Sequence, residues 1–448
     1  MPIEPRGEVL QIDSIRAPGR IGQRWAAQET VDRGLDVHAA GFAAPLRSPA
    51  VEDRVRQLAE LTVRFGANVQ PGQVVAMFAE TGQEDVARAV ADEAYRAGAK
   101  FVDLLYFDPY VKRSRLKHAS ADSLDYLPPW YGDRMLSLGD ERGARIAFAG
   151  STTEGLFDDV DPVRAGKDLF PFIKESLKVT GERTTNWCVV PAPTVAWART
   201  VHPELDGDAA YELLWKEVSH VMRLDEPDPV AAWEERIAAL NETAALLTER
   251  RFGGIHFRAP GTDVTIGLFP SSAWWAAEFS TIDGVRHLPN LPTEEVFTTP
   301  DPSRTEGTVT ATKPLLLPGG VTVEGLRVRF EGGRAVEVDA DVGAEAARAS
   351  FMVDEGAARL GEVALVDREG RIGKLGTVFR TTLIDENAAS HIAVGNGYSF
   401  VLADEDVPKM NESRIHADFM IGRDDMEVDG ITTDGARVPI LRGGAWQL

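Results

Sequence analysis

An alternation of apolar runs between residues 72 and 107 most constrains the fold. The run VVAMFAE predicts a buried strand, EDVARAVADEAYRAG predicts an amphipathic helix ending at Gly98, and KFVDLLYF predicts a second strand. Two strands joined by such a helix form a parallel pair with a right-handed crossover. The turn AETGQED between the first strand and the helix lacks the G-x-G-x-x-G pattern. We therefore expect a scaffold sheet here and no dinucleotide site.

The same kind of pattern extends on both sides of this unit. An apolar stripe that begins after Ser48 predicts a helix stopped by Gly66. Further strands are expected at RIAFAG and NWCVVPAP, and two longer helices at DAAYELLWKEVSHVMRL and DPVAAWEERIAALNETAALLTERR. We predict an α/β domain with linking helices over residues 48–250. Residues 1–47 mix Pro, Gly and Arg without a sustained period, which indicates an N-terminal arm or extension.

After residue 250 the pattern changes to short strands separated by glycine turns. Hairpins are expected around Gly261, around Gly332 and Gly333, and around Gly435. Adjacent short strands joined by tight turns are antiparallel. We predict that residues 251–448 form a second domain, of the α+β class and largely antiparallel.

Composition and charge exclude several classes of partner. The formal net charge is −22, whereas proteins that bind nucleic acid carry a basic face. Cys188 is the single cysteine, which excludes an intrachain disulfide and a thiolate cluster, and its apolar neighbours indicate a buried, inert thiol. No apolar run approaches the ~20 residues of a membrane span and no secretory leader follows Met1. We expect a cytoplasmic protein without nucleic-acid or membrane partners.

Candidate metal ligands are concentrated between residues 385 and 422, where DENAASHIAVGNGYSF precedes NESRIHADFMIG. His416 and Asp418 stand two residues apart in a β-like run, so a strand would direct both to one face, where they can share a cation. Asp385 or Asn387 could cap a short helix that carries His391. The alternative is a chance His-x-Asp pair beside a structural histidine.

Two acidic motifs supply further candidates. LPTEEVFTTP contains Glu294 and Glu295, and RLGEVALVD contains Glu362; each motif alone is also typical of a solvated surface. The combined set has oxygen and imidazole donors and no thiolate: Glu295, Glu362, His391, His416 and Asp418. Three carboxylates against two divalent cations leave a residual positive charge that lowers the pKa of a water held between the cations. This inventory is typical of a two-metal hydrolase.

The same motifs carry a family resemblance. PTEEVFTTP, LGEVALV, DENAASHIAVGNGY and HADFMIG, in this order, resemble the metallopeptidase family that contains aminopeptidase T and aminopeptidase S. The resemblance extends from about Val51 to the C-terminus. It implies a two-metal aminopeptidase with an N-terminal α/β domain, a C-terminal catalytic domain and a homodimer that encloses the active sites. By position, the implied metal ligands are Glu295, Glu362, His391, His416 and Asp418, and Tyr398 is the implied active-site tyrosine. Glu294 is the alternative to Glu295.

The expected function is a metal-dependent aminopeptidase that releases N-terminal residues from short peptides through a water activated by two metal ions. We expect two divalent ions per subunit, zinc or cobalt, with magnesium or manganese as alternatives. Tyr398 would donate a hydrogen bond to the developing oxyanion, and Glu294 or Glu386 would carry the proton. The alternatives are another dinuclear metal-dependent hydrolase and a non-catalytic metal-binding protein.

Overall fold

The computed structural model describes residues 48–448, apart from residues 151–152, 154, 169, 172 and 318–320. The predicted N-terminal arm, residues 1–47, lies outside the described residues. The described residues between Ser48 and Leu448 form one compact unit. A parallel sheet in its first half and antiparallel sheets in its second half confirm the predicted mixed α and β class. The division into domains at residues 250 and 251 stays a prediction.

The first half contains a four-stranded sheet in the order β2-β1-β3-β4. Its strands are β1 (Val74–Glu80), β2 (Phe101–Phe107), β3 (Ala144–Ala149) and β4 (Asn186–Pro191), and neighbouring strands are parallel. The predicted crossover helix is α2 (Glu84–Arg96), which joins the parallel pair β1 and β2. The strand-helix-strand prediction is therefore confirmed.

The predicted helices are present, with the expected end signals. Helix α1 (Pro49–Leu61) begins after Ser48, whose side chain accepts a hydrogen bond from the Val51 N–H, and continues as a π-helical turn (Thr62–Gly66). A Cβ atom at Gly66 would lie 2.8 Å from Cys188 Sγ, so this glycine permits close packing of the turn on β4. The other helices of this half are α3 (Pro109–His118), α4 (Pro129–Asp140), α5 (Pro162–Lys167), α6 (Lys174–Gly181), α7 (Val195–Val201), α8 (Gly207–Val221) and α9 (Pro229–Arg250).

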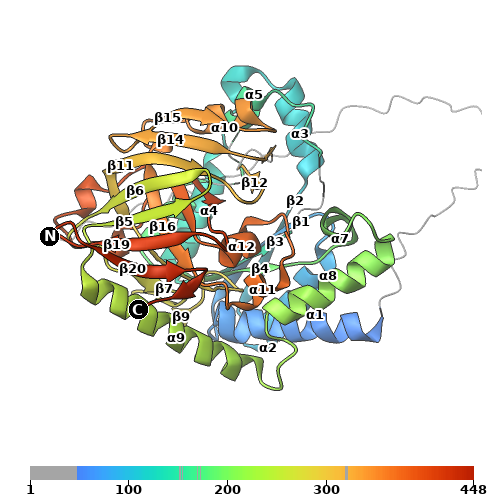
Figure 1. The fold of residues 1–448 in the computed structure, drawn as a ribbon. Coiled ribbons are helices and arrows are strands. Elements are labelled where there is room, and N and C mark those ends of the chain that lie inside the picture. Colours follow the sequence, from blue (N-terminus) through green and yellow to red (C-terminus); the bar gives the residue numbers. More distant parts are fainter. Residues whose placement is uncertain (1–47, 151–152, 154, 169, 172, 318–320) are drawn as a thin grey trace, which may run out of the picture. The chain divides into compact units, whose positions relative to one another are not determined.

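Helix α9 connects the two halves and supports the sheet that carries the candidate site. Asp228 caps its first turn by accepting a hydrogen bond from the Ala231 N–H, and Pro229 occupies the first helical position. Its buried residues recur every three or four positions: Trp233, Ile237, Leu240, Ala244 and Leu247. Helix α9 packs against strands β7 and β10 through this apolar stripe. Figure 1 shows α9 beside β7.

The second half contains an eight-stranded sheet in the order β15-β14-β11-β6-β5-β19-β20-β21. Its strands are β5 (Gly254–Ala259), β6 (Thr262–Leu268), β11 (Pro300–Thr310), β14 (Arg327–Glu331), β15 (Arg334–Asp339), β19 (Glu427–Ile431), β20 (Arg437–Arg442) and β21 (Ala445–Trp446). Neighbouring strands are antiparallel. The three predicted hairpins are β5 with β6, β14 with β15, and β19 with β20, so these predictions are confirmed.

A five-stranded antiparallel sheet, in the order β18-β17-β16-β10-β7, carries the candidate functional residues. Its strands are β7 (Trp275–Ala276), β10 (Glu295–Thr298), β16 (Leu360–Val366), β17 (His391–Gly395) and β18 (His416–Met420). Every residue of the central strand β16 is buried. The remaining short elements are β8 (Phe279–Ser280), β9 (Arg286–His287), β12 (Leu315–Leu316), β13 (Thr322–Val323), α10 (Ala344–Ser350), α11 (Arg371–Leu375) and α12 (Thr382–Asp385).

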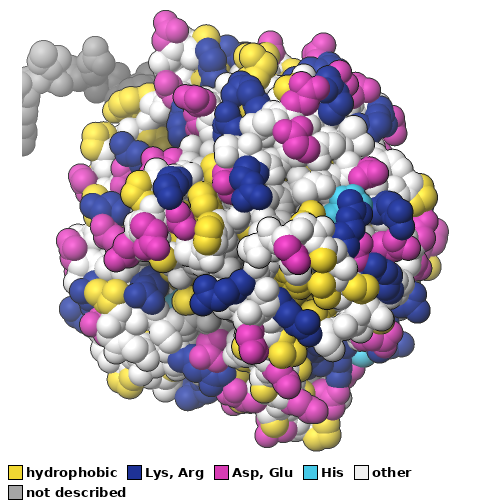
Figure 2. All heavy atoms as spheres, turned by 60° about the vertical axis from the view of Figure 1, so that its left-hand side comes forward, with side chains coloured by type: hydrophobic (Ala, Val, Ile, Leu, Met, Phe, Trp, Pro, Cys, Tyr) yellow, Lys and Arg dark blue, Asp and Glu magenta, His cyan; other side chains and the backbone are white. Residues whose placement is uncertain are grey.

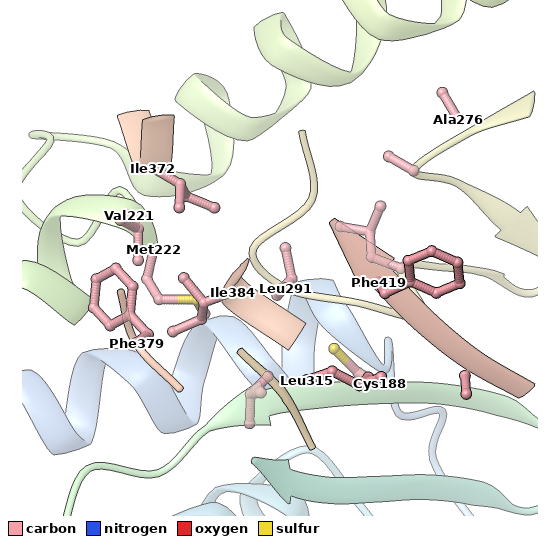
Figure 3. Close-up of a cluster of buried hydrophobic side chains, with 14 of the residues drawn as sticks. Cys188, Val221, Met222, Ala276, Leu291, Leu315, Ile372, Phe379, Ile384 and Phe419 are labelled. Carbon is pink, nitrogen blue, oxygen red and sulfur yellow. The ribbon is translucent and has the colours of Figure 1, made fainter. Parts of the chain in front are cut away.

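One buried apolar cluster includes residues from both halves of the chain. Figure 3 shows Cys188 of β4, Met222 after α8 and Phe419 of β18 within this cluster. Burial raises the pKa of the Cys188 thiol far above its usual value, so the prediction of a buried thiol is confirmed, and the thiol stays protonated at neutral pH.

The outer surface is charged, and its charges are mixed. Figure 2 shows acidic and basic side chains interspersed over one face of the molecule, so the net charge of −22 is not gathered into a single acidic area there. The helices described between residues 48 and 448 include none with the length and apolar content of a membrane span.

Candidate metal centre

The register of three neighbouring strands brings candidate ligands to one face of the five-stranded sheet. Asp418 of β18 pairs with Ala393 of β17, and Ala393 pairs with Glu362 of β16. Paired residues of adjacent strands point to the same face, and the methyl group of Ala393 leaves room between the two carboxylates. His416 and Asp418 lie on β18 with His416 Nε2 3.2 Å from Asp418 Oδ1. The predicted strand and its shared face are confirmed.

The expectation that a short helix carries His391 is wrong. Helix α12 ends at Asp385 and a short 3₁₀ turn spans Glu386–Ala388, whereas His391 is the first residue of strand β17. Asp385 does not cap a helix; its carboxylate accepts hydrogen bonds from the Phe379 N–H at 3.0 Å and the Thr381 N–H at 3.2 Å. The apolar run that starts at His391 pairs with β16 and β18, and this pairing determines its conformation.

The five predicted ligands converge. His391 Nε2 lies 3.0 Å from Glu295 Oε2, and His416 Nε2 lies 2.9 Å from Glu362 Oε2. Three overlapping groups each have donor atoms within 4.8 Å of one another: Glu295 with Glu362 and His391, Glu362 with His416 and Asp418, and Glu386 with His391 and Asp418. The groups share Glu362, His391 and Asp418, so the six residues form one continuous set of donors, called here the metal-site cluster.

Glu386 belongs to this cluster, although its place in the sequence predicts only a proton carrier. It lies in the 3₁₀ turn that precedes β17, is buried, and accepts a hydrogen bond from Asn290 Nδ2 at 3.3 Å. The sequence signal was its place in DENAASH, five residues before His391. That separation matches neither the period of a helix nor that of a strand, so no local pattern relates the two side chains.

Glu294 and Glu295 are both buried but point in different directions. Glu295 enters the metal-site cluster, while Glu294 Oε1 lies 2.9 Å from Arg223 Nη2 and its Oε2 lies 2.5 Å from Arg236 Nε. Successive residues of an extended chain project to opposite sides, so one of the two must leave the site. Glu294 is therefore part of a buried ion-pair network and not available to carry a proton at the cluster.

The donor set fits divalent cations. Within the described residues, none of the four carboxylates of the metal-site cluster has a Lys or Arg nitrogen at ion-pair distance; their charged neighbours are histidines. Glu295 Oε2 is buried and makes no hydrogen bond of good geometry there, although it lies near His391. Buried carboxylates without basic partners are costly unless a cation neutralises them. Oxygen and imidazole donors without thiolate suit zinc, cobalt, manganese and magnesium.

Burial and mutual repulsion shift the pKa values of the carboxylates in the metal-site cluster. Burial raises the pKa of Glu362, and it raises the pKa of Glu386 well above the usual value, with further contributions from neighbouring carboxylates. Burial alone would also raise the pKa of Asp418, but the adjacent His416 outweighs it and lowers the pKa. Carboxylates in one small volume therefore compete for protons or cations.

For the two imidazoles, burial and the neighbouring carboxylates have opposite effects on the pKa. Burial alone would lower the pKa of His391, but its hydrogen bond and attraction to Glu295 outweigh burial and raise the pKa to about 10. Burial is likewise outweighed at His416, where the nearby Asp418 and Glu362 raise the pKa well above the usual value. Histidine binds metal in its neutral form, so cations would have to displace these protons, and binding would release them.

Tyr398 lies at the edge of the metal-site cluster, with its hydroxyl 3.3 Å from His416 Nε2. Burial, followed by the charge of Glu362, raises its pKa well above the usual value, so the phenol is neutral and able to donate. The turn before it requires glycine at Gly395, where φ is 104° and a Cβ atom would lie 2.1 Å from the Ile415 carbonyl oxygen. The predicted glycine-flanked turn thus presents the ring to the cluster.

Carboxylates and imidazoles without thiolate, gathered on one face of an antiparallel sheet, are the donors that metal-dependent hydrolases use. The chain belongs to the family described as thermophilic metalloprotease (M29), whose model matches residues 51–446. This membership confirms the resemblance found in the motifs, and it implies a divalent metal, for which the metal-site cluster supplies candidate ligands.

Relatives of known activity are similar over nearly their whole length. The chain is 43% identical to aminopeptidase T of Thermus thermophilus over 89% of this chain and 99% of that protein. It is 35% identical to aminopeptidase PepS of Streptococcus thermophilus over 89% of this chain and 99% of that protein. The structure is similar to that of wild-type AmpT from Thermus thermophilus, with a TM-score of 0.79, 41% identity, and coverage of 89% of this chain and 100% of that chain. The chain is therefore an enzyme of a peptidase family.

Proposed function

We propose that this protein is an aminopeptidase that removes N-terminal residues from short peptides with two divalent cations per subunit. The observation that supports it most directly is the overlap of three donor groups through Glu362, His391 and Asp418. One cation needs three or four protein donors, so six donors that share residues suit a pair. The names of the relatives, all aminopeptidases, favour a peptide with a free N-terminus.

The ligands in this proposal are Glu295, Glu362, His391, His416 and Asp418, and Glu386 lies beside them as a carboxylate outside the ligand set. Bound cations supply charge that polarises the scissile carbonyl and makes a water nucleophilic near neutral pH. We expect zinc or cobalt, with magnesium or manganese as alternatives, because the donor set discriminates modestly among them. Cytoplasmic residence is part of the same proposal.

The chain's own groups would orient the substrate and move the proton. Tyr398 can donate its phenolic hydrogen to the oxygen on which negative charge develops, since the phenol stays neutral. Glu386 is the carboxylate best suited to accept a proton, because it lies beside His391 and Asp418 and burial raises its pKa well above the usual value. The Asn290 amide, which donates to Glu386 Oε1, keeps that carboxylate oriented.

Metal removal and N-terminal blocking test the proposal together. Prolonged chelation is expected to abolish hydrolysis of a free dipeptide such as Leu-Gly, and zinc or cobalt to restore it, with metal content followed by elemental analysis. The N-acetylated dipeptide should be hydrolysed at least about 10²-fold more slowly, because it lacks the free amine that orients the substrate. Equal hydrolysis of both forms would indicate another dinuclear hydrolase, and no turnover with any metal would indicate a binding protein.

Replacement of Tyr398 by Phe is expected to lower kcat by about 10²-fold, because one preorganised donor is lost. The metal content should stay unchanged, since the metal-site cluster keeps all its donors. Steady-state kinetics with elemental analysis measure both. A normal kcat in this variant would show that the phenol only packs against its neighbours.

We also infer a homodimer in which the α/β region, residues 48–250, limits access to the catalytic region, residues 251–448. The six cluster residues all lie between residues 295 and 418, which leaves the first region free for covering the site and pairing subunits. The expected mass by light scattering is about twice the 48.8 kDa of one chain. A dipeptide should be cleaved and a folded protein with the same exposed N-terminal residue should not. Cleavage of both substrates by a monomer would contradict the inference.

A further inference from the structure

Two asparagine side chains contact Glu386 of the metal-site cluster. Asn290 Nδ2 donates a hydrogen bond to Glu386 Oε1 at 3.3 Å, and Asn387 Nδ2 lies 3.5 Å from the same oxygen. Asn387 is fully buried and Asn290 is half-buried. A carboxamide can donate two hydrogens and accept at its oxygen, but it carries no charge. Neutral groups therefore set the direction of this carboxylate.

Asn387 also joins Glu386 to the strand that carries Glu295. Its Oδ1 accepts a hydrogen bond of 2.6 Å from the Glu294 N–H, and its Nδ2 donates to the Leu383 carbonyl oxygen at 3.0 Å. Glu294 directly precedes β10, whose first residue is Glu295. One buried side chain thus connects the proposed proton carrier to the strand that presents a proposed metal ligand.

The parallel sheet of the first half fixes the position of Asn290. Val189 of β4, which lies at the edge of that sheet, forms an isolated parallel bridge with Asn290. The Val189 N–H donates to the Pro289 carbonyl oxygen at 2.7 Å, and the Leu291 N–H donates to the Val189 carbonyl oxygen at 3.0 Å. The segment that contains Asn290 is therefore attached to β4, while its side chain contacts the metal-site cluster.

We propose that Asn387 is a positioning residue, which together with Asn290 holds the Glu386 carboxylate at a fixed place relative to Glu295. The inference rests on the proposed function, in which Glu386 is the proton carrier. Rates depend steeply on the placement of such a group, since a displacement of about 1 Å can cost about 10²-fold. Strand β4 thereby contributes to the reaction through Asn290, in addition to any part of the first half in covering the site.

Replacement of Asn387 by Ala is expected to lower kcat for Leu-Gly by about 10-fold to 100-fold, because Glu386 loses its fixed orientation. KM and metal content should stay within about 2-fold of those of the unmodified enzyme, since no ligand is removed. Asn290→Ala is expected to have an effect of the same kind. A loss confined to KM or to metal content would overturn the inference.

Asn387→Asp separates positioning of Glu386 from a purely structural connection. The aspartate keeps an oxygen that can accept from the Glu294 N–H, but its carboxylate has no hydrogen to donate to Glu386. A structural connection alone would leave kcat normal in this variant. The proposal expects kcat to fall at least as far as in Asn387→Ala.

A double variant tests whether Asn387 acts through Glu386. Once Glu386→Gln has removed the carboxylate, adding Asn387→Asp should change kcat by less than about 2-fold, whereas independent effects would multiply. A multiplied loss would overturn the inference. Normal kcat in Glu386→Gln alone would overturn both the inference and the role of Glu386 as proton carrier.

The matched control is Asn186→Ala. Asn186 lies on β4 and is 1% exposed, and its Nδ2 donates to the Ala67 carbonyl oxygen at 2.6 Å, outside the metal-site cluster. This variant should melt at a lower temperature with kcat unchanged. Asn290→Ser replaces Asn290→Ala if the alanine protein folds poorly. Normal kcat in the Asn290 variants and in Asn387→Asp would overturn the inference and leave the proposed function intact, whereas an unmodified, metal-loaded enzyme that hydrolyses no dipeptide would overturn the proposed function.

Discussion

Replacement of Glu362 by Gln is expected to lower turnover by at least about 10³-fold, because cation binding contributes several kcal/mol to catalysis and each 1.4 kcal/mol is a factor of ten. Glu362 belongs to two of the three donor groups and lies in the fully buried strand β16. Loss of its charge would weaken both proposed cation positions at once. Elemental analysis of the purified variant should accordingly find less than the full metal content.

The matched control for this experiment is Glu93→Gln. Glu93 is also a buried carboxylate, but it lies on α2 and pairs with Arg64 at 2.6 Å, outside the metal-site cluster. This variant should retain metal and activity although its ion pair is lost. If Glu362→Gln retained full metal and normal turnover, the proposed two-metal site would be wrong. Comparable losses in both variants would indicate a general effect of buried charge.

Replacement of Glu294 by Gln is expected to destabilise the protein by about 3 to 5 kcal/mol, because two largely but not fully buried arginines lose their common, fully buried carboxylate. Arg223 and Arg236 both contact Glu294, which is fully buried. Arg236 is also paired with Asp367, whose carboxylate accepts a hydrogen bond from Trp446 Nε1. Glu294, which directly precedes β10 of the five-stranded sheet, therefore connects this sheet to α9 through Arg236 and to the turn between α8 and α9 through Arg223.

The neighbouring variant Glu295→Gln provides the matched comparison. Its unfolding free energy should decrease less than that of Glu294→Gln, because His391 can release its proton when its partner is lost and an arginine cannot. Its metal content and activity should decrease more. Urea unfolding with a chelator present measures stability without the contribution of bound metal. The reverse pattern would assign the metal to Glu294 and contradict the geometry of the two side chains.

Much of the fold follows from local sequence pattern. The apolar runs around α2 predict the parallel pair β1 and β2, and glycine turns predict the hairpins, because side-chain period and turn chemistry are properties of a few adjacent residues. The same local rule predicts that His416 and Asp418 share a face. The order of the motifs identifies the family, whose model matches residues 51–446.

Residues that meet across long sequence separations could not be found by such patterns. Glu386 belongs to the metal-site cluster but lies in a three-residue 3₁₀ turn, which is too short to show a periodic pattern of apolar residues. The choice between Glu294 and Glu295 depends on arginines more than 50 residues earlier in the chain. His391 lies on a strand and not on a helix, since β16 and β18 supply the hydrogen-bonding partners. Each of these outcomes depends on contacts between distant segments.

The sequence by itself therefore determined most of the elements, the family and the chemical character of the donors, but not the strand that carries His391. Tertiary structure decided which donors meet. The register of β16, β17 and β18 depends on how the three strands pair, and the sequence of one strand alone does not specify that pairing. The ring contacts beside Tyr398 likewise depend on tertiary structure. Phe297 and Phe400 each follow a site residue by two positions, but their contact with Trp275 and Phe279 arises only when separate strands pair and pack.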